Sequence, residues 1–158
     1  MGKGKMKTFV PKSGEIPRGW FIVDAAGQPL GRLAVEVAKI LRGKHRPIFT
    51  PNADTGEFVI IINADKVGLT GKKEGEPLYH HTGYPGGIKE ISKGTLRTER
   101  PIKLVERTIK GMLPHNKIGA EMFRKLKVYG GAEHPHAAQQ PRTLSLEKPV
   151  RRVVRTAV

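Results

Sequence analysis

The sequence of 158 residues contains no cysteine, and this absence excludes disulfide bonds and zinc sites built from thiolates. It is also compatible with a reducing compartment, so the cytoplasm is the expected location. Long apolar runs are missing too: none approaches the roughly 18 residues of a membrane span. No apolar stretch follows the charged N-terminus as it would in a signal peptide. The sequence therefore predicts neither a membrane span nor a secretory signal.

Acidic residues are scarce relative to basic ones. The chain has 29 Lys and Arg against 14 Asp and Glu, which leaves a formal net charge of +15. A folded chain with this excess repels itself unless a polyanion screens it, so a negatively charged partner is expected. The basic residues form no amphipathic basic helix, which favours a phosphate backbone over a membrane surface. The predicted partner is nucleic acid.

Aromatic residues make up only 6% of the chain and apolar residues 37%, so the hydrophobic core should be modest. The length fits one domain. Composition changes along the chain predict three parts: a basic N-terminal arm over residues 1–19, a single α/β domain over 20–130, and an extended basic C-terminal tail over 131–158. The tail is rich in Pro, Ala and Gln and lacks the apolar density for its own core.

Within the central domain, hydrophobic patterning predicts a strand, a helix and a second strand. Residues 20–25 (WFIVDA) are typical of a short buried strand. Residues 32–43 (RLAVEVAKILRG) place their apolar side chains on one helical face and end at the stop signal Gly43. Residues 57–64 (EFVIIINA) suit a strand that is covered on both faces. This order predicts a parallel sheet with a right-handed crossover.

Loops that leave the strands of a parallel sheet gather at one edge, and three basic or glycine-rich loops are candidates for that edge. They are residues 44–46 (KHR), 68–73 (GLTGKK) and 80–87 (HHTGYPGG). We therefore expect a basic rim along this edge of the sheet.

Residues 101–114 (PIKLVERTIKGMLP) predict a helix of about three turns that starts at Pro101, a residue tolerated in a first turn. Basic residues three and four positions apart share one side of it and are spaced to touch successive phosphates. A stripe of charge on a helix is more often ordinary solvated surface, and this alternative stays open. The apolar positions expected to face the core are Ile102, Val105, Ile109 and Met112, and the basic ones are Lys103, Arg107 and Lys110.

A second helix is predicted over residues 118–126 (IGAEMFRKL), followed by a short strand and a glycine turn in LKVYGG. Its periodicity separates an apolar face from a basic face. The side chains expected inside are Ile118, Met122 and Leu126, and those expected outside are Arg124, Lys125 and Lys127.

Residues 80–90 (HHTGYPGGIKE) hold two histidines, an aromatic residue and three glycines beside a lysine, which suits a metal site, a phosphate-binding loop or an RNA contact. Metal binding is disfavoured because adjacent histidines on a strand point to opposite faces. The better spaced pair His134 and His136 has only Glu133 nearby. GLTGKK lacks the glycine spacing and the hydroxyl of a phosphate-binding loop, and no serine has a nucleophile's setting. We therefore predict no enzyme, no cofactor and no small-molecule substrate.

The TGYPGG segment is best interpreted as a turn whose glycines let the backbone approach folded RNA. Tyr84 would then offer a face on which a base stacks. In the alternative interpretation the glycines merely supply turn conformations and Tyr84 caps the core.

Several motifs together give the chain a specific resemblance. KTFVPK, GRLA, LRGKHRP, FTPN, GKK, TGYPGG, GMLP, LKVY and HPHAAQ occur over about residues 6–140 in the order and spacing of one family. On these motifs the chain resembles the bacterial large-subunit ribosomal protein L-thirteen family. The resemblance implies a three-layer α/β/α fold with a short, mostly parallel four-stranded sheet and basic N- and C-terminal extensions.

The same resemblance implies a noncatalytic component of the large (50S) ribosomal subunit. Such a protein binds 23S ribosomal RNA, acts early in subunit assembly and meets neighbouring large-subunit proteins; some members also bind messenger RNA and repress translation. Any Mg²⁺ at the interface would belong to the RNA, and no membrane contact is expected. Residues 1–5 and those from about 142 onward lie outside the usual limits of the family, so no contacts are implied for them.

Two groups of residues are predicted to contact RNA. Those that match family motifs are Lys44, His45, Arg46, Lys72, Lys73, Tyr84, Gly86, Gly87, His134 and His136. The remaining candidates are His81, Lys89, Lys103, Arg107, Lys110, Lys117, Arg124, Lys125 and Lys127. Because surface substitutions usually cost little stability, replacing Lys44 and Arg46 by Ala is expected to weaken incorporation into subunits without lowering the thermal transition.

Overall fold

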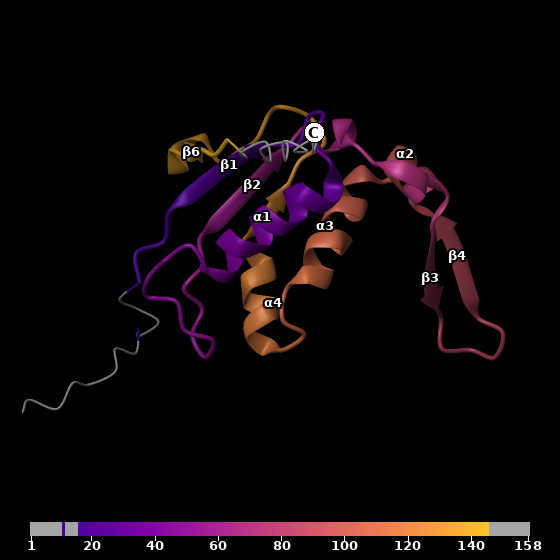
Figure 1. Ribbon diagram of the computed structural model, residues 1–158, viewed down its shortest axis with the longest axis horizontal. Coiled ribbons are helices and arrows are strands. Elements are labelled where there is room, and N and C mark those ends of the chain that lie inside the picture. Colours follow the sequence, from indigo (N-terminus) through magenta and orange to yellow (C-terminus); the bar gives the residue numbers. More distant parts are fainter. Residues whose placement is uncertain (1–10, 12–15, 146–158) are drawn as a thin grey trace, which may run out of the picture.

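The protein is built on a four-stranded parallel sheet, as the computed structural model in Figure 1 shows. The structure describes residue 11 and residues 16–145. Most of the predicted N-terminal arm, and the predicted tail from residue 146 onward, therefore lie outside the described residues. The strands of the sheet are β1 (Trp20–Asp24), β2 (Phe58–Ile62), β5 (Leu126–Val128) and β6 (Arg142–Thr143).

The sheet has the order β5-β2-β1-β6, and every neighbouring pair is parallel. In β2 the side chains of Val59, Ile60 and Ile61 are all fully buried, so both faces of this strand are covered. A strand without a polar face suits the interior of a parallel sheet, which helices or other chain segments cover from both sides. The predicted strand–helix–strand unit and the parallel sheet are confirmed.

Helix α1 (Leu30–Arg42) connects β1 to β2 and buries the face that its periodicity predicts. Leu33, Val37 and Leu41 on this face are completely inaccessible to solvent. Gly43 ends the helix in the left-handed conformation, with φ of 79°, and its N–H caps the last turn. The helix begins two residues before the predicted start, because the chain already turns helical after Pro29.

Three further helices follow β2 in the sequence. They are α2 (Lys93–Glu99), α3 (Pro101–Met112) and α4 (Lys117–Arg124). Hydrophobic periodicity does not predict α2, because its two turns bury only Leu96. The helix begins after Ser92, whose Oγ accepts a hydrogen bond from the N–H of Thr95 at 3.0 Å and so caps the first turn.

Helix α3 is confirmed, but its buried face is rotated from the predicted one. Leu104, Val105 and Ile109 are buried, whereas Ile102 and Met112 are 38% and 39% exposed. The helix packs against both α1 and α2, so positions 104 and 105 lie at the centre of the contact and the predicted end positions lie at its margins.

The sheet separates two unequal outer layers. Helices α1, α3 and α4 contact one another or the sheet on the face to which Val23, Val59 and Ile61 contribute core side chains. Trp20 belongs to the opposite face by strand alternation, and there its ring lies 5.2 Å from that of His136, between centroids. The connection from β5 to β6, which contains the short 3-10 helix Ala137–Gln139, therefore covers the second face. The three-layer α/β/α arrangement is confirmed.

The same connection changes the interpretation of the predicted tail. Residues 142–143 form β6 and pair with Phe21 and Ile22 of β1. The N–H of Leu144 also donates to the carbonyl of Ile22 at 2.9 Å. Residues 142–144 thus join the sheet, so this part of the predicted tail is continuous with the α/β domain. Strand pairing supplies the stabilisation that their apolar content does not.

Strands β3 (Pro77–His81) and β4 (Ile88–Ser92) form a separate antiparallel hairpin. Figure 1 shows that this hairpin projects from the body beside α2. Leu78 and Ile91 at its base pack against the core. The part of the hairpin beyond Leu78 and Ile91 therefore adds no side chain to the hydrophobic core.

Candidate nucleic-acid interface

The three basic loops predicted to share one edge of the sheet lie at different places. Residues 44–46 precede β2 and lie where the strands begin, and Arg46 donates to the carbonyl of Pro17 at 2.7 Å. Residues 68–73 follow β2 and lie where the strands end; the N–H of Leu30 donates to the carbonyl of Gly68 at 2.9 Å. The prediction of a single basic rim is wrong, because α1 runs antiparallel to the strands and returns the chain to the opposite edge.

Arg46 and His45 both lie against the buried carboxylate of Glu57, and Arg46 forms an ion pair with it. The Arg46 guanidinium contacts Glu57 directly, and the Nε2 of His45 lies 3.3 Å from the other carboxylate oxygen. The side chains of Glu57 and Arg46 are only 7% and 17% exposed. Arg46 is therefore mainly a structural residue and not the free surface cation that the sequence suggests. Lys44, by contrast, is exposed and has no ion-pair partner among the described residues.

Lys125 is buried, which contradicts the prediction that it points outward to RNA. Its Nζ lies 2.6 Å from the Oδ1 of Asp54 and donates to the carbonyl of Leu41 at 3.3 Å. Burial lowers the pKa of Lys125, while the bond to Asp54 opposes this shift. Lys125 caps α4 directly before β5, so its side chain points under the end of α1.

The glycine at position 56 makes room for this buried ammonium. A Cβ on Gly56 would overlap the carbonyl of Leu41 and approach the Nζ of Lys125 to 2.8 Å. Arg18 completes the cluster, since its guanidinium lies 3.7 Å from the Oδ2 of Asp54. Lys125 and Arg18 stabilise the junction of α1, α4 and the sheet. Both form ion pairs with Asp54 of the same chain.

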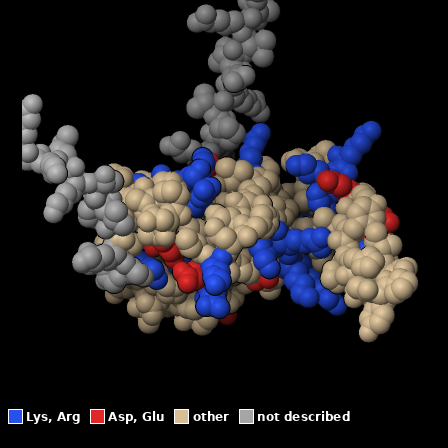
Figure 2. Space-filling view, turned by 90° about the horizontal axis from the view of Figure 1, so that it is seen from below, with Lys and Arg blue, Asp and Glu red and all other residues tan. Residues whose placement is uncertain are grey.

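Helix α3 presents its basic stripe to solvent. Lys103, Arg107 and Lys110 are all exposed, and they share one side of the helix as their spacing predicts. Arg107 also donates to the carbonyl of Tyr79 in β3 at 3.0 Å, which ties the hairpin to α3. Lys110 lies over the ring of Phe123, 5.6 Å from its centroid. Figure 2 shows Lys and Arg side chains gathered on the body beside the hairpin.

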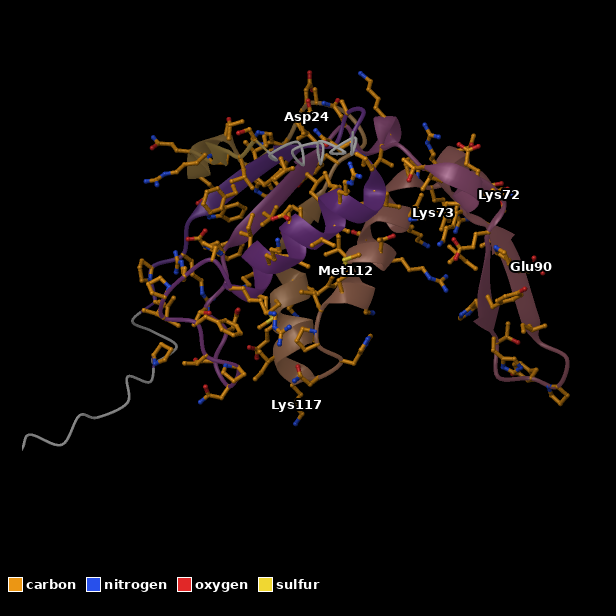
Figure 3. All side chains as sticks on the ribbon, in the orientation of Figure 1. Asp24, Lys72, Lys73, Glu90, Met112 and Lys117 are labelled. Atoms are coloured by element: carbon orange, nitrogen blue, oxygen red, sulfur yellow. The ribbon has the colours of Figure 1, made fainter. Side chains whose placement is uncertain are left out.

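Lys72 and Lys73 lie in the 3-10 helix Gly71–Gly75, and both are exposed. Figure 3 shows the two side chains near α2. The acids of the same loop are already neutralised: Glu74 pairs with Arg97 at 3.1 Å and Glu76 with Lys93 at 2.7 Å. The hydrogen bond and the charge of Lys93 lower the pKa of Glu76. Lys72 and Lys73 themselves form no ion pair in the part of the chain that the structure describes, although the charge of Lys73 adds to the lowering of the Glu76 pKa.

A groove of about 470 Å³ lies between α1 and α3. Its apolar lining comes from Val35, Ala38 and Met112, and Figure 3 shows Met112 beside α1. Its remaining lining residues are Lys39, Arg42 and Lys44. The groove thus has a basic rim around a small apolar floor.

The TGYPGG segment forms the turn of the hairpin. The N–H of Thr82 donates to the carbonyl of Gly87, and the N–H of Gly87 to that of Tyr84, both at 2.9 Å. Gly86 has a φ of 69°, and a Cβ on Gly87 would overlap the Thr82 hydroxyl. The glycines therefore do serve the turn. Tyr84 is 76% exposed, so the alternative that it caps the core is wrong.

The histidines of the HPH motif contribute to the fold. The Nε2 of His136 lies 2.8 Å from the hydroxyl of Tyr129, and its ring packs on Trp20. The Nδ1 of His134 accepts from the backbone N–H of His136 at 3.3 Å. Both rings are half-buried, so they hold the β5-to-β6 connection against the sheet. The Nδ1 of His81 likewise accepts from the N–H of Gly83 at 3.0 Å within the hairpin turn.

The remaining candidates lie on the surface. Lys89 on β4, Lys117 and Arg124 on α4, and Lys127 on β5 are exposed. No group of three or more metal-ligating side chains occurs within residues 16–145. The described helices are all too short or too polar to cross a membrane.

The described geometry defines a basic α/β protein with unpaired cations on several sides, in which several acids are paired with other cations of the chain. Comparison with known proteins identifies the family of this chain. The profile of the family described as Ribosomal protein L13 matches residues 18–135. The chain therefore belongs to the ribosomal protein L13 family, whose members are structural and not enzymatic proteins.

Curated relatives match almost the whole chain. Large ribosomal subunit protein uL13 of Alcanivorax borkumensis is 57% identical over 142 residues, which cover 89% of this chain and 100% of the relative. The protein of the same name from Syntrophomonas wolfei is 55% identical, covering 90% and 99%. That from Synechococcus elongatus is also 55% identical, covering 89% and 94%.

Proposed function

We propose that this chain is a structural constituent of the large ribosomal subunit that binds 23S ribosomal RNA and acts early in subunit assembly. The observation that carries the proposal is a set of exposed cations without acidic partners among the described residues. They include Lys44, Lys72, Lys73, Lys89, Lys103, Arg107, Lys110, Lys117, Arg124 and Lys127. Their number suits a partner that presents many phosphates.

The positions of these cations support a bridging role. Lys72 and Lys73 lie near the edge where the strands end, whereas Lys44 follows α1 at the opposite edge. The stripe on α3 lies between the sheet and the hairpin. Phosphates bound at these separate places would belong to different RNA segments, so the protein would reduce the repulsion between segments that pack together. Neighbouring large-subunit proteins would complete its surroundings in the cytoplasm.

The proposed role requires no cofactor held by the chain, and Mg²⁺ at the interface would be bound by RNA. The same cations would also attract phosphates of a folded messenger RNA, because phosphate contacts carry no sequence information. Measuring the affinity of the chain for a 23S RNA fragment and for a messenger leader tests a secondary role in translational repression. Comparable affinities for the two RNAs would support that role.

A salt titration with matched variants tests the proposal. Lys72→Ala/Lys73→Ala removes two free cations, whereas Lys39→Ala/Arg97→Ala removes two that are paired with Glu36 and Glu74. Both variants lower the net charge equally. We expect only the first to weaken binding to 23S RNA fragments, by about tenfold at moderate salt, and to reduce the salt slope by about one for each phosphate that is no longer neutralised.

Filter binding or fluorescence anisotropy at several salt concentrations gives both quantities. Equal losses in the two variants would mean that net charge alone, and not a defined contact, attracts RNA. A salt-independent affinity of the unmodified chain would contradict the proposal as a whole.

A further inference from the structure

The two faces of the β3–β4 hairpin differ in character. Strand register places Leu78 opposite Ile91 and His80 opposite Lys89 on one face. Since Leu78 and Ile91 pack against the core, this is the face directed to the body. Tyr79 pairs with Glu90 and His81 with Ile88 on the opposite, outer face. The outer face therefore carries no Lys or Arg.

The outer face exposes large apolar side chains. Tyr79 is 55% exposed and Ile88 is 64% exposed, and they are diagonal neighbours in the register. Only six large hydrophobic side chains are exposed within the described residues, and Tyr84 at the tip is a third one on this hairpin. Such a concentration on one small element is typical of a surface that a partner covers.

The charge of this face disfavours RNA as the partner. Glu90 lies opposite Tyr79 and has no ion-pair partner within the described part of the chain. Figure 3 shows that its side chain points away from the body. A carboxylate beside the exposed side chains of Tyr79 and Ile88 repels phosphates and attracts Lys or Arg of a polypeptide. Figure 2 agrees, because the visible surface of the hairpin is mostly uncharged while the adjacent body is lined with Lys and Arg.

The backbone of the hairpin adds a second recognition element. The N–H of Thr82 donates to the carbonyl of Gly87, so residues 82 and 87 form a hydrogen-bonded pair. In an antiparallel hairpin, hydrogen-bonded and non-hydrogen-bonded pairs alternate. The pairs 79–90 and 81–88 are therefore not hydrogen-bonded to each other, and the backbone N–H and C=O groups of residues 79, 88 and 90 point away from the partner strand. The carbonyl of Tyr79 indeed faces outward, since Arg107 of α3 binds it. This bond occupies the outer edge of β3. The outer edge of β4 lies on the other side of the hairpin, next to Ile88 and Glu90.

We propose that the outer side of the hairpin, formed by Tyr79, Ile88, Glu90 and the open edge of β4, docks an extended basic segment of a neighbouring protein in the large subunit. The edge of β4 would pair with the backbone of that segment, the apolar side chains would pack on Tyr79 and Ile88, and Glu90 would bind a Lys or Arg. The inference rests on the proposed function, because the subunit supplies the partner.

Site-specific photo-crosslinking in assembled subunits tests this docking surface. A photoreactive amino acid is placed at Ile88 of the full chain, and in a matched variant at Lys89, which lies on the opposite face of the same strand. Large subunits that contain each variant are purified and irradiated. We expect Ile88 to crosslink to a Lys- or Arg-rich peptide of another protein, identified by mass spectrometry, and Glu90→Lys to reduce this product at least about fivefold.

The other outcomes are decisive as well. A crosslink from Ile88 to RNA, or no crosslink in subunits that contain the chain, would overturn the docking surface and leave the ribosomal role intact. Absence of the chain from purified subunits would instead contradict the proposed function on which the inference depends.

A binding measurement provides an independent arm. Ile88→Ser/Glu90→Lys changes two exposed side chains, so the thermal transition should stay unchanged. We expect this variant to bind protein-free 23S RNA within about twofold of the unmodified chain but to be lost from subunits in a salt wash several times faster. A comparable loss of affinity for protein-free RNA would show that this face contacts RNA.

Discussion

Two basic regions of the molecule, residues 44–57 and residues 68–76, use their charges in opposite ways. In the first region Arg46 binds the buried carboxylate of Glu57, and Asp54 receives the ammonium of Lys125. In the second region the acids pair with cations of α2, and Lys72 and Lys73 are exposed without an ion pair among the described residues. A high density of Lys and Arg therefore does not by itself identify an RNA contact.

What separates the two regions is the location of their acids. Glu57 and Asp54 are 7% and 8% exposed, so a cation beside either of them compensates a charge that solvent cannot reach. Glu74 and Glu76 are more than half exposed, and water screens their ion pairs. Residues of the first region that pair with Glu57 or Asp54 should therefore respond to mutation mainly in stability, and the unpaired cations of the second region mainly in affinity for RNA.

The largest effect is expected at Lys125. Lys125→Ala leaves Asp54 buried with only Arg18 nearby, at 3.7 Å, so the free energy of unfolding should fall by about 3 kcal/mol. Urea denaturation followed by circular dichroism measures this loss. Lys127→Ala, two residues further on an exposed position of β5, is the matched control and should change stability by less than about 0.5 kcal/mol. Similar losses in the two variants would contradict the structural role of Lys125.

A smaller loss is expected at Arg46. Arg46→Ala removes the main partner of Glu57 and the bond to the carbonyl of Pro17, which should cost about 2 kcal/mol of stability. Lys44→Ala should leave stability nearly unchanged and weaken binding to 23S RNA instead. Thermal denaturation and RNA titration of both single variants separate the two roles. If Arg46→Ala proved as stable as Lys44→Ala, the two residues would act together at the surface, as the sequence alone suggests.

The smallest effect concerns pH. Burial lowers the pKa of Lys125 below its ordinary value of 10.5, so the unfolded chain retains this proton to higher pH than the folded chain does. The free energy of unfolding should therefore rise with pH between the lowered pKa and 10.5. Lys125→Met keeps an unbranched side chain without the amine, and subtracting its stability curve from that of the unmodified chain isolates this contribution. A difference that falls with pH across this window would contradict the burial of the ammonium.

Much of the core fold follows from local patterns. An apolar face at helical spacing that ends at a left-handed glycine, as in α1 and Gly43, is compatible only with a helix packed on one side. An uninterrupted apolar run, as in β2, suits a strand that is covered on both faces. The strand, the helix and the parallel sheet are therefore predictable from the sequence. Helix α2 and the association of β6 with the sheet are not, because each depends on contacts with distant segments more than on its own periodicity. Membership of the family is likewise visible in the sequence, since it rests on several motifs in a fixed order.

The sequence by itself determined the charge of the protein, the order of its main elements and the turn that its glycines form. Only the tertiary structure decided which cations are free, because partners such as Asp54 and Lys125, or Glu57 and Arg46, meet through the packing of α1, α4 and the sheet. It also decided which face of the hairpin is apolar and outward. Electrostatic pairing depends on distance and burial in space, and neither quantity is contained in local sequence spacing.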